Sequence, residues 1–206
     1  MRCAAGLIGF CATLLFCGAI KAAEPAIVVV FGDSLSNAWV RSLDPRTARQ
    51  LRLINESRPG RPTDAAGEFD QMLARQPGVD LLVIALGTND SGDSSAATVP
   101  RAVENIRKMV RAARKAAGDE LPVLVVGPPN MSGSTAPQRV RKLQELNRGF
   151  RDLAAKLGCR FLTLYGVLPD SSLAADGTHP DAAGNALIAK VLLPELLAAV
   201  RRRQTQ

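Results

Sequence analysis

The stretch "IVVVFGDSLS", residues 27–36, decides the fold class. It begins as an unbroken apolar run and then changes abruptly to Gly32, Asp33 and Ser34. Strands that are buried on both faces of a parallel sheet are apolar without alternation, so this run predicts an inner strand of such a sheet. Gly, Asp and Ser favour turns, so the break fits an ordinary turn. It also fits a serine nucleophile held at the end of a strand, and the rest of the chain has to decide between the two.

Four more short runs rich in leucine or β-branched residues follow, with helical patterns between them. These runs lie at 51–55, 79–86, 121–126 and 159–165. Apolar residues at helical spacing predict helices over about 64–75, 98–117, 140–157 and 181–200, the second of them capped by Thr98. Pro45 interrupts any helix in 36–50, which leaves that segment undecided. Strands that alternate with helices predict a single α/β domain over residues 24–206, with a doubly wound parallel sheet.

The first 23 residues differ in composition from the rest of the chain. Arg2 is followed by an uncharged, mostly apolar stretch up to Ile20, and Lys21 and small residues end it. A basic start and an apolar middle are typical of a secretory signal peptide, so we expect an exported protein, periplasmic or secreted. An uncleaved N-terminal anchor is the alternative, because the stretch approaches the length that spans a bilayer.

The cysteines bear on the redox chemistry of the mature chain. Three of the four cysteines lie within residues 1–23, which leaves Cys159 alone after cleavage. An intramolecular disulfide is then impossible. Cys159 precedes a strand-like run, so we interpret it as a small buried apolar residue in preference to a catalytic thiol.

The net charge of +7 and the placement of the basic residues bear on whether the chain binds nucleic acid or an anionic surface. The basic residues are scattered, except at 201–203 and in the segment 139–151, and only eight residues are aromatic. This favours solvated helix faces over nucleic-acid binding, while attraction to an anionic surface or substrate remains open. The first strand is not followed by a Gly-x-Gly-x-x-Gly loop, which disfavours dinucleotide binding.

The single histidine of the chain tests whether Ser34 is a nucleophile. A serine hydroxyl needs a base to take its proton, and His179 is the one imidazole present. It lies in "DGTHP", residues 176–180, after the fifth predicted strand, with Asp176 three residues earlier. A carboxylate in that loop can reach the far ring nitrogen and fix the tautomer. The alternative is that residues 176–180 form an ordinary surface turn before the last helix.

Two further loops carry hydrogen-bond donors that acyl transfer requires. Asn89 in "LGTND", residues 86–90, follows the third strand, and Gly60 in "NESRPGRPT", residues 55–63, follows the second. Each is also a plausible turn residue by itself. The carboxyl ends of parallel strands meet at one edge of the sheet, so these groups converge there with Ser34 and its amide. That convergence favours a serine hydrolase over four unrelated turns.

These blocks also carry a family resemblance. FGDSL (31–35), Gly60, GTND (87–90) and DGTHP (176–180) are similar, in order, to the signature blocks of the GDSL or SGNH hydrolase family. The resemblance implies a flavodoxin-like five-stranded sheet of order 2-1-3-4-5, with Ser34 as nucleophile and Asp176–His179 completing a triad. It implies Gly60, Asn89 and the Ser34 amide as oxyanion donors, and no metal or other cofactor. "LVIALGTND", "VLVVGPP" and Gly-Arg-Pro-Thr at 60–63 resemble the arylesterase and acyltransferase branch.

The expected function is therefore a serine esterase that hydrolyses or transfers acyl groups. Nothing in the sequence resembles a deep apolar lid, which favours short acyl chains. The alternatives are a thioesterase or lysophospholipase-like hydrolase, a carbohydrate O-deacetylase of the envelope, or an envelope binding protein with an inactive site. The expected partner is a small-molecule, lipid or glycan ester and not a nucleic acid. Membrane contact is expected only through an uncleaved N-terminal segment, and the sequence does not indicate the oligomeric state.

Overall fold

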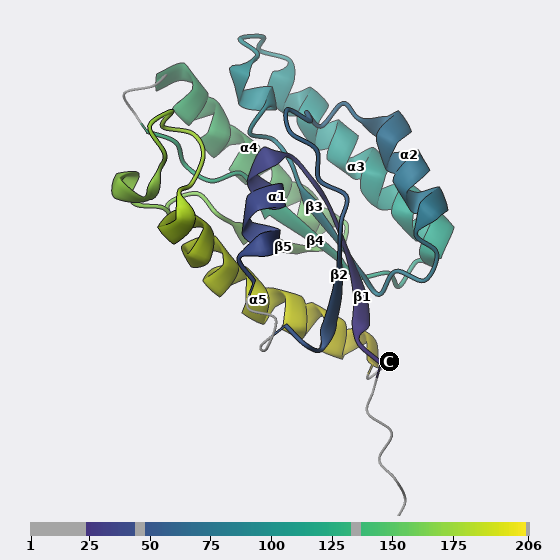
Figure 1. Cartoon of the computed structure of the whole chain (residues 1–206). Coiled ribbons are helices and arrows are strands. Elements are labelled where there is room, and N and C mark those ends of the chain that lie inside the picture. Colours follow the sequence, from purple (N-terminus) through teal and green to yellow (C-terminus); the bar gives the residue numbers. More distant parts are fainter. Residues whose placement is uncertain (1–23, 44–47, 133–136, 205–206) are drawn as a thin grey trace, which may run out of the picture.

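A five-stranded parallel sheet forms the centre of the molecule (Figure 1). The computed structural model describes residues 24–43, 48–132 and 137–204, so the predicted signal peptide lies outside the described residues. The strands are β1 Ala26–Gly32, β2 Leu51–Asn55, β3 Leu81–Ala85, β4 Val123–Gly127 and β5 Arg160–Thr163. Their order in the sheet is β2-β1-β3-β4-β5, with all neighbours parallel. The expected α/β class and strand order are confirmed.

Helices cover both faces of the sheet, which makes three layers (Figure 1). α1 (Ser34–Arg41) and α5 (Ala182–Gln204) pack on one face. α2 (Ala66–Arg75), α3 (Thr98–Ala117) and α4 (Pro137–Lys156) pack on the other. Two short 3₁₀ turns, η1 (Asp90–Gly92) and η2 (Asp170–Ser172), lie in the connections after β3 and β5.

The unbroken apolar character of β1 follows from burial on both faces. Val29 and Phe31 belong to the core under α2, α3 and α4, whereas Val28 and Val30 belong to the core under α1 and α5. All four side chains are fully buried. Side chains alternate between the two faces of a strand, so every position of β1 must be apolar.

The structure defines one helix that the sequence left undecided and corrects the start of another. α1 begins at Ser34 itself and ends at Arg41, ahead of Pro45, which is outside the described residues. The expectation that Thr98 caps α3 is wrong, because the cap position is Ala97 and Thr98 is the first helical residue. The turn before α3 is already closed by side chains, since Asp93 accepts from the Ser95 amide and Ser95 accepts from the Ala97 amide.

α5 is long and apolar enough to cross a membrane by length and composition alone. It is instead a core helix of the domain, because Ile188, Leu192 and Leu196 are fully buried against the sheet. Cys159 is half-buried at the edge of the other core, and burial raises the pKa of its thiol. This agrees with a packing role for that cysteine.

Candidate active site

Ser34 occupies the first helical position after β1. Asp33 is the N-cap of α1, and its Oδ1 accepts the Leu35 amide at 3.0 Å. The backbone amide of Ser34 therefore lies at a helix N-terminus, where orphan N–H groups and the helix dipole favour negative charge. Ser34 is partly exposed, and its Oγ lies 3.0 Å from Nε2 of His179. The structure thus brings together two predicted site residues from opposite ends of the chain.

Asp176 holds His179 from the other side of the ring. Its Oδ2 lies 2.6 Å from His179 Nδ1, and its Oδ1 accepts the amides of Thr178 and His179, both at 2.9 Å. These contacts, the His179 amide first, lower the pKa of Asp176 to about 2. An ionised carboxylate at Nδ1 favours the tautomer with its proton on Nδ1, which leaves Nε2 free to accept from Ser34.

The loop that carries His179 is fixed by backbone hydrogen bonds. The Ala174 amide donates to the carbonyl of His179 at 2.7 Å, within an antiparallel bridge between Leu173 and Pro180. The Ser132 amide, from the connection after β4, donates to the carbonyl of Gly177 at 2.8 Å. Two separate connections therefore set the position of the imidazole.

The two predicted oxyanion residues occupy neighbouring loops. Gly60 is exposed with φ +73°, and a Cβ there would meet nothing within 4 Å, so backbone conformation and not space favours glycine. Asn89 is partly buried, and its Nδ2 donates to the carbonyl of Arg61 at 3.1 Å. The same Nδ2 lies 3.4 Å from Oδ2 of Asp33. Asn89 therefore links the loops that follow β1, β2 and β3.

Asp33 is the most buried carboxylate of the site, at 2 % exposure. Burial raises its pKa to about 6, although the amides of Leu35 and Ser36 lower it. Its charge also interacts with His179, which lowers the pKa, and with Asp90, which raises it. At neutral pH this side chain carries a negative charge that the interior only partly compensates.

Sequence reasoning missed a set of polar residues that hold the two donor loops together. Thr63 donates through its hydroxyl to Asp90 at 2.5 Å, and its amide donates to the same carboxylate at 3.0 Å. Arg61 is buried at 5 % exposure and binds backbone carbonyls from two segments. Arginine is usually exposed, so a single sequence gives no signal that this one is buried.

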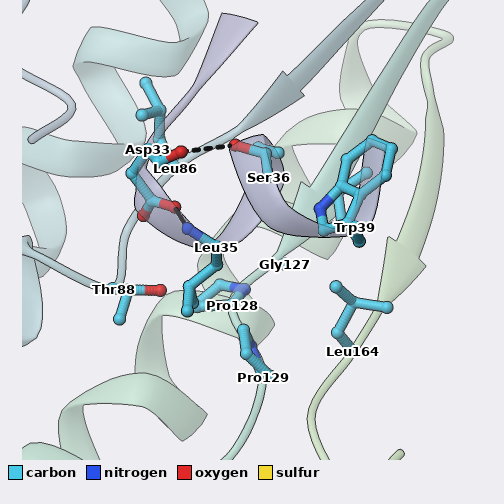
Figure 2. Close-up of a pocket in the computed structure, with 12 residues that line it drawn as sticks. Asp33, Leu35, Ser36, Trp39, Leu86, Thr88, Gly127, Pro128, Pro129 and Leu164 are labelled. Carbon is cyan, nitrogen blue, oxygen red and sulfur yellow. Dashed lines mark hydrogen bonds between the residues drawn. The ribbon is translucent and has the colours of Figure 1, made fainter. Parts of the chain in front are cut away.

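Two cavities flank these residues. One of about 10 Å³ lies between α1 and the ends of β3 and β4 (Figure 2), with Leu35, Trp39, Thr88, Pro128 and Leu164 in its lining. It has room for about one water-sized group. The other, of about 300 Å³, is lined by one proline and seven residues with polar side chains: Pro62, Asp64, Asn89, Asp90, Asp93, Thr98, Arg101 and Asn105. Asn89 is thus at the wall of the larger space.

No group of three or more His, Cys, Asp or Glu side chains arranged to hold a metal ion occurs among the described residues. The residues that meet at this site supply a hydroxyl, an imidazole, carboxylates and an amide. These groups suffice for proton transfer to and from a serine nucleophile.

A family model described as GDSL-like lipase/acylhydrolase matches residues 27–187. That span runs from β1 into α5 and contains Ser34, Gly60, Asn89, Asp176 and His179. No curated protein matches the chain.

Solved structures of esterases have the same fold. A lipase/acylhydrolase from Enterococcus faecalis is 24 % identical with a TM-score of 0.69, and the match covers 83 % of this chain and 95 % of that one. An aryl esterase from M. smegmatis is 22 % identical with a TM-score of 0.72, covering 84 % and 99 %. A carbohydrate acetylesterase family member from Sinorhizobium meliloti is 24 % identical with a TM-score of 0.70, covering 85 % and 99 %.

Proposed function

The chain belongs to the GDSL-like lipase/acylhydrolase family and is a carboxylic ester hydrolase, and on this premise we propose that it cleaves short-chain esters with Ser34 as nucleophile. In this proposal His179 is the general base and Asp176 orients it. The observation that carries the proposal is the continuous series of contacts from Asp176 through His179 to Ser34, at 2.6 and 3.0 Å. Such a series is the arrangement by which a serine hydroxyl is activated.

The reaction has two steps. Ser34 Oγ attacks the ester carbonyl carbon while its proton passes to Nε2 of His179. The negative charge that develops on the carbonyl oxygen is stabilised by the amides of Ser34 and Gly60 and by Nδ2 of Asn89. The tetrahedral intermediate then expels the alcohol, which takes the proton from His179. Water, or a second alcohol, attacks the acyl-serine with His179 again as base, and Ser34 is regenerated.

The small cavity beside α1 adjoins the turn that carries Ser34, although Ser34, Gly60, Asn89 and His179 do not line it. Leu35, the neighbour of Ser34, lines it together with Pro128 and Pro129 (Figure 2). Its volume of about 10 Å³ leaves room for a group the size of a methyl but not for an alkyl chain. Acetyl esters, which need no pocket for an alkyl chain, are therefore the expected substrates.

The direct test is replacement of Ser34 by alanine. Ser34→Ala should abolish hydrolysis of p-nitrophenyl acetate and labelling by a fluorophosphonate, because both require the nucleophilic Oγ. Ser42→Ala is the matched control, since Ser42 is an exposed serine at the C-terminal end of the same helix. If the Ser34→Ala protein still turns over the ester or is still labelled, the proposal fails.

One observation favours a second candidate, a carbohydrate O-deacetylase. The larger cavity beside Asn89 has carboxylate, amide, hydroxyl and guanidinium groups in its lining, which suit a hydroxyl-rich alcohol. The structural neighbours include a carbohydrate acetylesterase family member. A substrate panel of acetylated oligosaccharides, phenyl esters of increasing chain length, thioesters and lysophospholipids separates this candidate from a simple arylesterase, a thioesterase or a lysophospholipase.

A further inference from the structure

We propose that Arg61 is a positioning residue that holds the oxyanion donors in place around Ser34. The inference rests on the proposed function, and it concerns a residue that touches none of the reacting atoms. Arg61 lies directly after Gly60, and its side chain is turned inward, with 7 % of it exposed. A buried guanidinium has to be fully hydrogen-bonded, so its partners show what it organises.

The side chain of Arg61 joins the loop after β2 to the end of β1. Nη1 donates to the carbonyl of Gly32 at 2.8 Å and to the carbonyl of Glu56 at 2.5 Å. Gly32 is the last residue of β1 and lies two positions before Ser34. The guanidinium therefore fixes the separation between the nucleophile strand and the loop that carries the Gly60 amide.

The backbone of Arg61 joins the same loop to Asn89. The Arg61 carbonyl accepts the Asn89 amide at 3.1 Å, which orients the side-chain NH₂ group. One residue thus contacts the end of β1 through its side chain and Asn89 through its backbone, and it is bonded covalently to Gly60. The three proposed donors come from three different strand ends, and Arg61 connects all three.

Two groups hold the guanidinium in its orientation. Nε and Nη2 donate to Oε2 of Glu68 on α2 at 3.0 and 2.9 Å. The guanidinium also stacks on Phe31, 4.0 Å from the ring centroid. Arg58 and Arg61 together lower the pKa of Glu68 to about 2, with the Arg58 hydrogen bond first, so this carboxylate stays ionised. A lysine at position 61 would supply charge but not the planar set of donors.

The test compares Arg61→Met with Arg58→Met. Both arginines bind Glu68, but the side chain of Arg58 is 49 % exposed, and it donates to Glu68 and to the carbonyl of its neighbour Pro59. Arg61→Met should lower kcat for p-nitrophenyl acetate by about 100-fold with KM changed less than threefold, because misplacing catalytic groups by about 1 Å costs that much. Arg58→Met should leave kcat within threefold of the parent.

A second readout separates positioning from simple stability. A trifluoromethyl ketone forms a tetrahedral adduct with the serine, and its oxygen occupies the oxyanion position. Its inhibition constant should rise in Arg61→Met in proportion to the fall in kcat/KM, measured well below the Tm of each variant. A role confined to folding would lower Tm and leave the inhibition constant of the folded enzyme unchanged, which would overturn the proposal. Equal losses in both methionine variants would overturn it as well.

If Arg61→Met does not fold, the Glu68→Gln variant tests whether Arg61 positions the oxyanion donors. The glutamine keeps Arg61 but weakens its anchor on α2, and we expect about a tenfold loss of kcat and a parallel rise in the inhibition constant. A Glu68→Gln enzyme with the same constants as Arg58→Met would contradict the proposal. Loss of all turnover in Ser34→Ala but none in Arg61→Met would leave the proposed function standing while removing the role of Arg61.

Discussion

Asp33 and Asp176 are two carboxylates near one histidine, and their pKa values move in opposite directions. Asp33 is buried, and its pKa rises to about 6. Asp176 is half-exposed and accepts two backbone amides besides the imidazole, and its pKa falls to about 2. Environment therefore separates the roles: Asp176 is charged at every pH at which the enzyme would work, whereas Asp33 titrates within that range.

Asp176→Asn should lower kcat by about 10³- to 10⁴-fold. An amide at this position no longer favours the His179 tautomer with its proton on Nδ1, so Nε2 is no longer free as a base. The measurement is kcat for p-nitrophenyl acetate at pH 7.5. Asp170→Asn, an exposed aspartate of η2 in the same connection, is the control and should retain activity. An active Asp176→Asn enzyme would refute the proposed orienting role.

Asp33 should make the folded state less stable as the pH rises from about 4 to 6. The unfolded chain ionises this carboxyl near its model value of 3.8, but the folded chain does so near 6, so the folded state holds the proton across that window. A raised acid pKa therefore lowers the free energy of unfolding above the window, by roughly 3 kcal/mol at most.

Asp33→Asn tests this, because asparagine is an equally good N-cap and carries no charge. Urea unfolding at pH 4.5 and 7.5 gives the change in free energy of unfolding for each protein. The parent should lose more stability between the two pH values than Asp33→Asn does. Parallel pH dependences in the two proteins would show that Asp33 is not the titrating group.

At the scale of elements, the turn from β1 into α1 is shaped by packing as much as by chemistry. A Cβ on Gly32 would lie 1.9 Å from Ser36 Oγ and 2.9 Å from the carbonyl oxygen of Ala85. Ser36 Oγ donates to the Asp33 carbonyl at 3.0 Å, so moving it aside would break this hydrogen bond (Figure 2). The glycine of Gly-Asp-Ser is thus required for helix α1 to approach the sheet.

Gly32→Ala should lower the free energy of unfolding by roughly 2–3 kcal/mol, as expected for overpacking against backbone. Gly67→Ala is its counterpart, because a Cβ on that glycine in α2 meets nothing within 4 Å. It should raise stability by about 0.5–1 kcal/mol through helix propensity. Urea unfolding of both variants checks the contrast, and a neutral Gly32→Ala would contradict the steric account.

The strands could be predicted because burial on both faces makes each run continuously apolar. The residues at the strand ends could be predicted because the groups that acyl transfer needs directly follow those runs. The five strands and the approach of Ser34 to His179 and Asp176 followed from them, whereas the strand order was expected from the family resemblance. The prediction that Thr98 caps α3 was wrong, because the side chains of Asp93 and Ser95 accept the backbone amides of the turn before this helix. Arg61 was missed for another reason: its burial depends on partners 5, 7 and 29 residues away in the chain.

At the scale of the whole molecule, residues 1–23 differ in composition from the domain that carries the site. We propose that they direct export and are removed, and their basic start and apolar middle support this. Loss of Arg2 and Lys21 leaves a net charge of +5 on the mature chain, and α5 remains an apolar helix of the core.

The mature protein is expected to begin at Ala23 or Glu24. Expression of the full chain in a bacterial host followed by intact-mass measurement of the exported protein gives the N-terminus. A chain that starts at Glu24 should hydrolyse p-nitrophenyl acetate at the rate of the exported protein, because β1 begins at Ala26. Recovery of the unprocessed chain in the membrane fraction would show that the segment is an anchor.

The contact between Ser34 and His179 has a consequence for how activity is acquired during folding. It closes a loop of 145 residues, whereas β1 pairs with β2 over a much shorter stretch of chain. Closure over long separations is entropically costly and follows local pairing in most folding reactions. If His179 is the base, as proposed, a nascent chain that has formed β1, β2 and β3 still lacks it and cannot cleave esters before β5 and the His179 loop have docked. Enzymatic activity is therefore a late and stringent reporter of complete folding in this protein.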